Sequence, residues 1–152
     1  MFKFEQIKDF LKTNQVDLNS SKWVVISWFD KEWKVLFVKW LIFTDENLES
    51  NLKKLFDKFI LPNKRLKTLI IDIVDDIEEI KDISKVLKLN LKENWIFIWD
   101  VKNADIWAFI LPDTKWISDF KQAYKIIKNK VNFSSSAVNL YTFKSKRLVL
   151  ES

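Results

Sequence analysis

The sequence predicts an α+β fold with a single mixed, largely antiparallel sheet and flanking helices. Two observations favour this class. Helical spacing and short strand-like apolar runs are interspersed along the chain, and an early hairpin pattern is not followed by the sustained strand–helix–strand alternation of a parallel sheet. The length of 152 residues suits one domain with a substantial core, so we expect residues 1–152 to form a single domain.

The first elements are a short helix and a hairpin. Residues 4–11 carry apolar side chains at helical spacing. Two apolar runs, 23–29 and 35–38, flank a polar turn at 30–33, which is the pattern of a β-hairpin. A longer helix follows, with Thr44 or Asp45 as its expected cap and with an apolar face made of Leu48, Leu52, Leu55, Phe56 and Phe59.

The remaining elements complete the sheet. Residues 69–75 form a β-branched run that we expect to be a central strand. Residues 95–99 and 108–111 have strand character around a turn. A helix capped by Ser118 or Asp119 and a closing strand at 138–143 end the predicted fold.

Composition excludes several classes of chemistry. The chain has neither cysteine nor histidine, so a typical zinc site and catalytic devices built on Ser-His-Asp or Cys-His are not expected. We expect no metal and no cofactor. No apolar run approaches the length of a membrane helix, and the N-terminus lacks a signal-peptide pattern, which favours the cytoplasm. The net charge of +5 comes from lysines spread along the chain.

Glycine is absent, whereas tryptophan occurs eight times. Roughly ten glycines are expected at this length. Trp33 lies in the hairpin turn, Trp95 opens a strand and Trp116 precedes a helix, and such places often require the backbone freedom of glycine. Our hypothesis is that the natural host reads UGA as glycine and that this chain was translated with UGA as tryptophan. The intact mass of the natural protein distinguishes the two possibilities.

The tryptophans can also be taken literally. Indoles on a basic chain can form a stacking surface for single-stranded nucleic acid, and buried strand tryptophans are ordinary core residues. The acidic residues clustered at the end of the predicted central strand, Asp72, Asp75, Asp76, Glu78 and Glu79, can bind Mg²⁺ or share a proton. A solvated loop is the simpler interpretation of that acidic cluster.

The C-terminal third carries a family resemblance. Residues 107–113 end in Leu-Pro-Asp, a helix follows Trp116, and residues 138–143 read Val-Asn-Leu-Tyr-Thr-Phe. With glycine at positions 107 and 116, this order resembles the AMMECR-type domain family, which has a strand ending in Leu-Pro, a helix and a closing Leu-Tyr-x-Phe strand. Earlier segments are also similar to the family pattern, with Trp33 at its hairpin glycine.

The resemblance implies a site and also shows departures from it. The family hallmark Leu-Arg-Gly-Cys-Ile-Gly corresponds to residues 38–43, where Lys39 takes the arginine position and Trp40 the first glycine, while the cysteine and the second glycine are missing. The family's Asp-Pro-Arg-Phe is reduced to residues 57–59. We therefore expect a binding cleft formed by the candidates Lys39, Trp40, Asp57, Phe59, Pro112 and Asp113.

The resemblance also implies partners. Members of the family are commonly encoded beside a Memo-like protein and a radical-SAM protein, which implies an accessory role or a step in a modification pathway. Two alternatives remain open on the residues alone, namely a non-specific nucleic-acid-binding module and a small enzyme that uses carboxylates and lysine. Binding is favoured over catalysis because neither histidine nor thiol is present for fast proton transfer.

Overall fold

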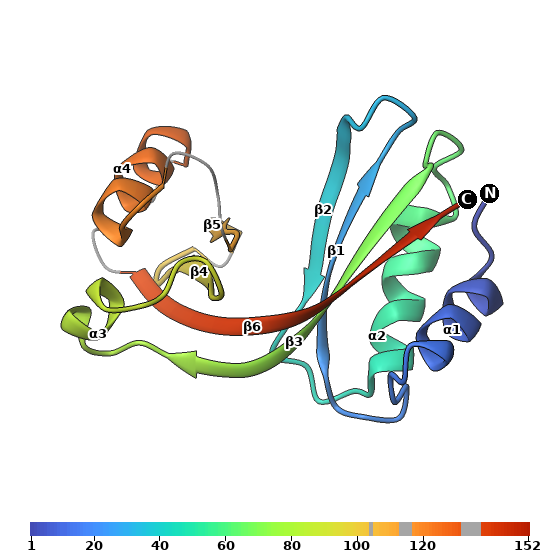
Figure 1. The fold of residues 1–152 in the computed structure, drawn as a ribbon, viewed down its shortest axis with the longest axis horizontal. Coiled ribbons are helices and arrows are strands. Elements are labelled where there is room, and N and C mark those ends of the chain that lie inside the picture. Colours follow the sequence, from blue (N-terminus) through green and yellow to red (C-terminus); the bar gives the residue numbers. More distant parts are fainter. Residues whose placement is uncertain (104, 113–116, 132–137) are drawn as a thin grey trace. The chain divides into compact units, whose positions relative to one another are not determined.

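The computed structural model describes residues 1–103, 105–112, 117–131 and 138–152. The chain divides into two compact units (Figure 1), one made of residues 1–75 with 145–152 and the other of residues 76–144. Both units contain strands and helices, which confirms the predicted α+β class.

Six strands form one sheet in the order β2-β1-β3-β6-β4-β5. β1 pairs antiparallel with β2 and β3, and β4 pairs antiparallel with β5 and β6. The expected central position of the β-branched run is confirmed, because β3 is third in this order. The strand bounds are β1 Trp23–Phe29, β2 Val35–Leu41, β3 Thr68–Glu79, β4 Trp95–Asp100, β5 Trp107–Ile110 and β6 Val138–Glu151.

The first unit packs helices on one face of its strands (Figure 1). The amphipathic pattern near the N-terminus forms α1, Phe4–Thr13. The longer predicted helix is α2, Leu48–Leu55, continued by a π-helical turn, η1, Phe56–Ile60. Their apolar faces pack against β1 and β3 in a core that includes Ile7, Leu11, Val24, Ile26, Trp28, Leu48, Leu52, Leu55, Leu69 and Ile71.

The expected cap of α2 is wrong. Asn47 is the N-cap, and its side-chain oxygen accepts the backbone N–H of Ser50. Thr44 instead donates its hydroxyl hydrogen to Oδ1 of buried Asn51 at 3.0 Å. The apolar positions of the helix do not show which nearby residue is the N-cap. The side chains of Thr44, Asp45 and Asn47 can each accept a hydrogen bond from a backbone N–H of the first turn.

The hairpin loop is held by Asp30. Its carboxylate accepts the backbone N–H groups of Lys34 at 3.0 Å and Glu32 at 2.9 Å. These bonds, that of Lys34 first, hold the pKa of Asp30 below its ordinary value. This stabilisation is present above the unfolded pKa and is lost as the pH falls through the lowered folded pKa.

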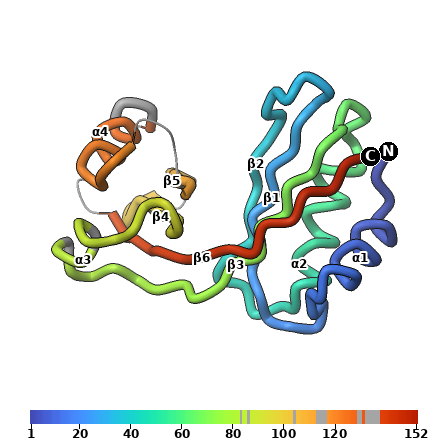
Figure 2. Tube along the Cα trace, in the orientation of Figure 1, coloured from blue at the N-terminus to red at the C-terminus, as the bar shows by residue number. Residues whose placement is uncertain are grey.

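At the same end of the unit (Figure 2), the chain after η1 joins β1 through a bond from Lys67 N–H to the Phe29 carbonyl.

The second unit has a smaller core. It contains α3, Ile83–Leu87, and α4, Phe120–Lys130. One of the two expected caps, Asp119, begins α4 by accepting the backbone N–H of Gln122 at 2.8 Å. Residues of α4 pack with those of β4 and β5, namely Phe120, Ala123 and Ile127 with Ile96, Ile98, Ala108 and Ile110. The short α3 lies in a polar segment whose structure the sequence left open.

β6 is longer than the sequence pattern predicts. The expected strand ended at Phe143, whereas β6 continues to Glu151. Residues 144–147 are polar, so the apolar alternation that predicts a strand ends before them. Two of them, Ser145 and Arg147, bind a buried polar partner instead of packing in the core. Arg147 donates from Nε and Nη2 to the two carboxylate oxygens of Asp72, at 2.9 and 3.1 Å, and Ser145 donates to the same carboxylate at 3.0 Å.

The described tryptophans have different environments. Trp33 has φ 60° and is 59% exposed. It is the only tryptophan with positive φ in the described ranges. Trp28 and Trp95 are buried. Of the positions where glycine was expected from the turn pattern, Trp33 is therefore the one with both a positive φ and an exposed side chain among the described residues. Trp23, Trp40, Trp99 and Trp107 are partly buried in strands. Trp116 lies outside the described residues.

The pairing of Arg147 with Asp72 predicts a large effect on stability. The Asp72 side chain is 0% exposed, so replacing Arg147 with Met leaves a buried charge without its guanidinium. We expect a loss of about 3 kcal/mol or more in the free energy of unfolding, measured by urea denaturation. Arg65→Met is the matched control, with an expected change within about 0.5 kcal/mol because Arg65 is an exposed loop residue. Equal effects of the two changes contradict this assignment.

The left-handed backbone at Trp33 predicts that glycine is better than alanine there. Both Trp33→Gly and Trp33→Ala remove the indole, but only glycine adopts φ 60° without a steric cost from Cβ. We expect the glycine variant to be more stable than the alanine variant by about 1 kcal/mol, measured by thermal or urea unfolding. An alanine variant of equal or greater stability shows that this turn is unstrained.

Candidate functional site

A pocket of about 680 Å³ lies between β2 and the α2–η1 helix. Its lining contains four of the six predicted site residues, Lys39, Trp40, Asp57 and Phe59. The other lining residues are Leu41, Lys54, Leu55 and Lys58. The pocket therefore combines an aromatic and aliphatic wall with several cationic side chains.

Pairing of β2 with β1 positions Lys39. Lys39 is opposite Ile26 and Phe37 is opposite Trp28, and both of these β1 residues belong to the helix-side core. Side chains alternate between the faces of a strand, so Phe37 and Lys39 share the face that meets η1. This register brings a lysine from an edge strand beside the helix.

The π-helical turn positions the opposite wall. Leu61 donates its backbone N–H to the Phe56 carbonyl at 2.8 Å, five residues back. The wider turn carries Asp57, Lys58 and Phe59, which all line the pocket. Single π-helical turns within α-helices are frequent at functional sites.

Two lysines converge on one aromatic ring. Lys39 Nζ lies 4.9 Å from the ring centroid of Phe59, and Lys58 Nζ lies 5.4 Å from the same centroid. Lys39 Nζ is also 6.0 Å from the ring of Phe37. The aromatic rings stabilise these cations modestly. Within the described part of the chain, neither lysine forms an ion pair with a carboxylate, so both charges are available to an anion.

The carboxylate of the pocket is already compensated. Asp57 Oδ1 accepts from Lys53 Nζ at 2.6 Å, one helical turn away, and both side chains are half exposed. Lys54 is similarly paired with Glu46. Exposed pairs such as these contribute little stability, but they reduce the local charge. Lys39 and Lys58 consequently dominate the electrostatics of this pocket.

The remaining predicted site residues belong elsewhere or are not described. Pro112 follows β5 in the second unit. Asp113 lies outside the described residues. The expected convergence of Lys39, Asp57 and Asp113 therefore stays a prediction, and the geometry joins only the first two around one pocket.

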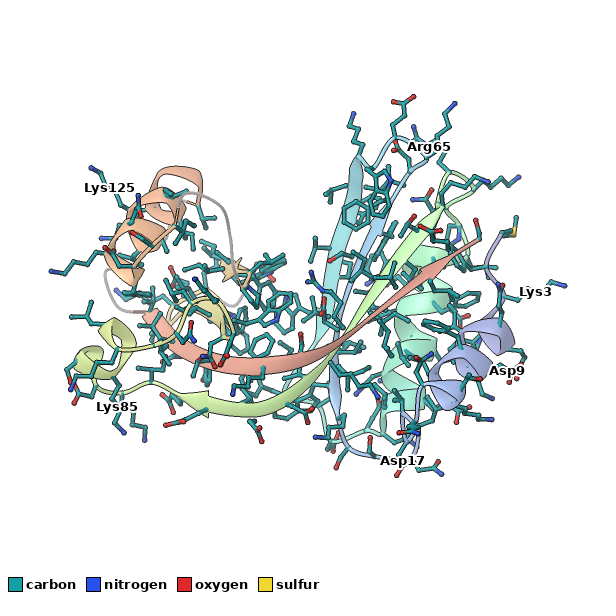
Figure 3. The ribbon with its side chains drawn as sticks, in the orientation of Figure 1. Lys3, Asp9, Asp17, Arg65, Lys85 and Lys125 are labelled. Atoms are coloured by element: carbon teal, nitrogen blue, oxygen red, sulfur yellow. The ribbon has the colours of Figure 1, made fainter. Side chains whose placement is uncertain are left out.

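A second hollow of about 470 Å³ adjoins the first through Lys58 and Phe59. Its other lining residues are Phe37, Pro62, Asn63, Lys64 and Arg65. Figure 3 shows Arg65 near the end of the unit that carries the β1–β2 turn. Sequence reasoning missed this hollow. The available signal was the group of basic residues at positions 58, 64 and 65, around the end of the apolar helix face.

A third hollow differs in its charge. It is lined by Phe4, Glu5, Lys8, Asn47, Glu49, Ser50, Lys53, Lys54 and Asp57. Lys8 pairs with Glu49 at 2.9 Å, and this hydrogen bond raises the pKa of Lys8 above its ordinary value. Acidic and basic groups balance here, so this hollow offers little excess charge for an ion.

The acidic cluster is not the solvated loop that we expected. β3 continues through Glu79, so all five residues belong to a strand. Asp72 is held by Arg147 and Ser145, and Asp75 pairs with Lys22. Among the described residues, no group of three or more potential ligands is arranged to hold a metal ion. Asp72 and Asp75 therefore have structural roles, because each is paired with a basic side chain of the first unit.

Comparisons with known proteins give a fold relation. No family model and no curated protein matches the chain. An uncharacterised protein from Pyrococcus horikoshii, PH0010, has a similar crystal structure, with a TM-score of 0.62 and 12% identity. The similarity covers 96% of this chain and 86% of that protein. At this identity, the relation concerns the fold alone. No helix in the described ranges has both the length and the apolar character needed to cross a membrane.

Proposed function

We propose that this chain is a diverged AMMECR-type domain protein of the cytoplasm that binds an anionic group in the pocket between β2 and η1. In this role it acts as a partner or accessory of Memo-like and radical-SAM proteins. The observation that carries the binding proposal is the convergence of Lys39 and Lys58 on the ring of Phe59. Two cations beside an apolar wall can bind an anion that has an apolar body.

Backbone geometry supports the family assignment. Position 43, which corresponds to the second hallmark glycine, has φ 61°, and position 33, which corresponds to the hairpin glycine, has φ 60°. Glycine adopts such angles at no steric cost, whereas Phe43 and Trp33 do not. The family pattern thus has glycine at two positions where this backbone favours it.

One buried indole supports the proposed translation of glycine codons. Trp28 is 0% exposed, and its Nε1–H has no hydrogen-bond acceptor among the described residues. Buried indole N–H groups usually have a partner. If position 28 is glycine in the natural protein, this polar group is absent.

Binding is favoured over catalysis at this pocket. Asp57 is paired with Lys53, and the chain contains neither histidine nor cysteine to move a proton quickly near neutral pH. The alternative of an enzyme that uses carboxylates and lysine therefore has weaker support. A bound ligand that undergoes chemical change with Lys39 or Asp57 present, and not without them, would reverse this preference.

Anion binding is tested with inorganic phosphate and pyrophosphate. We expect the intact chain to bind pyrophosphate more tightly than phosphate, because two cations can meet two charged groups. Lys39→Ala and Lys58→Ala should each weaken binding about tenfold, measured by isothermal titration calorimetry. Lys125→Ala is the matched control, since Lys125 is an exposed residue of α4 (Figure 3). Equal losses from all three variants contradict a specific pocket.

The partner role predicts complex formation. The chain and the Memo-like protein of the same organism, mixed at about 100 µM, should elute together in size-exclusion chromatography if the complex has a micromolar dissociation constant. The radical-SAM protein is tested in the same way. Elution of both candidate partners apart from this chain rejects the accessory role while leaving anion binding intact.

A further inference from the structure

We propose that the two adjoining hollows form one continuous surface for single-stranded nucleic acid. We call this surface the basic strip, and it consists of Phe37, Lys39, Lys58, Phe59, Lys64 and Arg65. It includes Lys39 and Lys58 of the proposed anion pocket and extends beyond them, so part of it rests on that proposal. No tryptophan belongs to the strip itself, although Trp28 packs against one of its members, Phe37.

The continuity of the strip follows from shared walls. Lys58 and Phe59 line both hollows. Phe37 lines the second hollow and lies near Lys39 of the first, with 6.0 Å between the Lys39 ammonium and the Phe37 ring. The hollows of about 680 and 470 Å³ therefore adjoin, and a chain-like ligand can follow them.

The charge of the strip is strongly one-sided. Lys39, Lys58, Lys64 and Arg65 supply four cations, and none of them forms a salt bridge within the described ranges. The carboxylate of Asp30, whose pKa is lowered first by the backbone N–H of Lys34, also interacts with Arg65. Among the described residues that line the second hollow, none is acidic. Asp57 is the acidic residue of the first hollow, and it is paired with Lys53. This excess charge fits a phosphate backbone.

Exposed aromatic rings favour a single strand over other polyanions. Phe37 is 49% exposed although it is a large apolar residue on a strand. Its ring lies 5.5 Å from Trp28 and is tilted by 39°, which supports it from the core. Bases stack on such rings only when they are free of a duplex. A peptide whose side chains are all carboxylates would use the cations but would present no aromatic group to stack on the Phe37 ring.

The test uses fluorescence anisotropy with a labelled oligothymidylate of about 12 nucleotides and the intact chain. We expect binding at low salt, with a slope of log K against log salt of about −3 for four phosphate contacts. Phe37→Ala should weaken binding about tenfold through loss of stacking. The double change Lys64→Ala and Arg65→Ala should weaken binding and reduce the magnitude of the slope by about 1.4, that is, by about half.

Controls separate this proposal from the anion pocket and from unfolding. Phe37→Leu keeps an apolar side chain that packs on the core but removes the π face, so it should lose affinity like Phe37→Ala. Neither Phe37 variant should alter pyrophosphate binding by more than about twofold. Trp33→Gly and Lys125→Ala should bind the oligonucleotide as the unchanged chain does, because neither residue belongs to the strip.

Several results overturn the strip. They are absence of oligonucleotide binding at low salt, full affinity in both Phe37 variants, a duplex bound as tightly as the single strand, and a poly-glutamate peptide that competes as well as the oligonucleotide. If the intact chain does not bind pyrophosphate but binds the oligonucleotide in a way that depends on Phe37, the proposed anion pocket is rejected and the strip is retained. The failure of one proposal is thus distinguishable from the failure of the other.

Discussion

The pairing of Asp72 with Arg147 is the constraint on which the central sheet of the first unit depends. Asp72 lies in the middle of β3, opposite Val25 of β1, and its side chain is fully buried. A buried carboxylate without a partner lowers the free energy of unfolding by several kcal/mol, so a cation must lie next to Asp72 in the folded protein. Arg147 on β6 supplies two parallel hydrogen bonds, which a lysine cannot reproduce. The chain has 24 lysines and 2 arginines by its sequence, and one arginine occupies this place.

The pairing register of the strands links β3 to the candidate site on β2. β3 pairs with β1, and β1 pairs with β2, so the position of each strand fixes the face on which the next presents its side chains. A shift of one residue in β2 would remove Phe37 and Lys39 from the helix side. The π-helical turn completes the site from the opposite wall by directing Lys58 and Phe59 toward β2. The site is therefore a consequence of strand pairing and of one local widening of the helix.

Two residues other than glycine have left-handed backbone angles next to β2, in a chain that contains no glycine. Trp33 and Phe43 flank the exposed strand β2 at its two ends, with φ near 60°. Non-glycine residues at such angles store about 1 kcal/mol or more of strain each. Phe43 partly offsets this cost by an edge contact with Trp23 at 5.1 Å, and Trp33 contacts Phe29 at 5.8 Å. A chain without glycine must place other residues wherever its turns demand positive φ.

Patterns in the amino-acid sequence were sufficient to predict the fold class and most of the helices and strands. Apolar periodicity located α1, α2, α4 and the first residues of the strands within a few residues, because burial on one face imposes that period. The family resemblance, and not the periodicity, named four residues that line one pocket, Lys39, Trp40, Asp57 and Phe59. The length of β6 depends on tertiary contacts. Arg147 interrupts the apolar pattern of the strand, but in the fold its guanidinium binds the buried carboxylate of Asp72. Tertiary contacts also place Lys58 in that pocket and Phe37, Lys64 and Arg65 in the hollow beside it. Contacts between a strand and a helix leave no periodic signal along the chain.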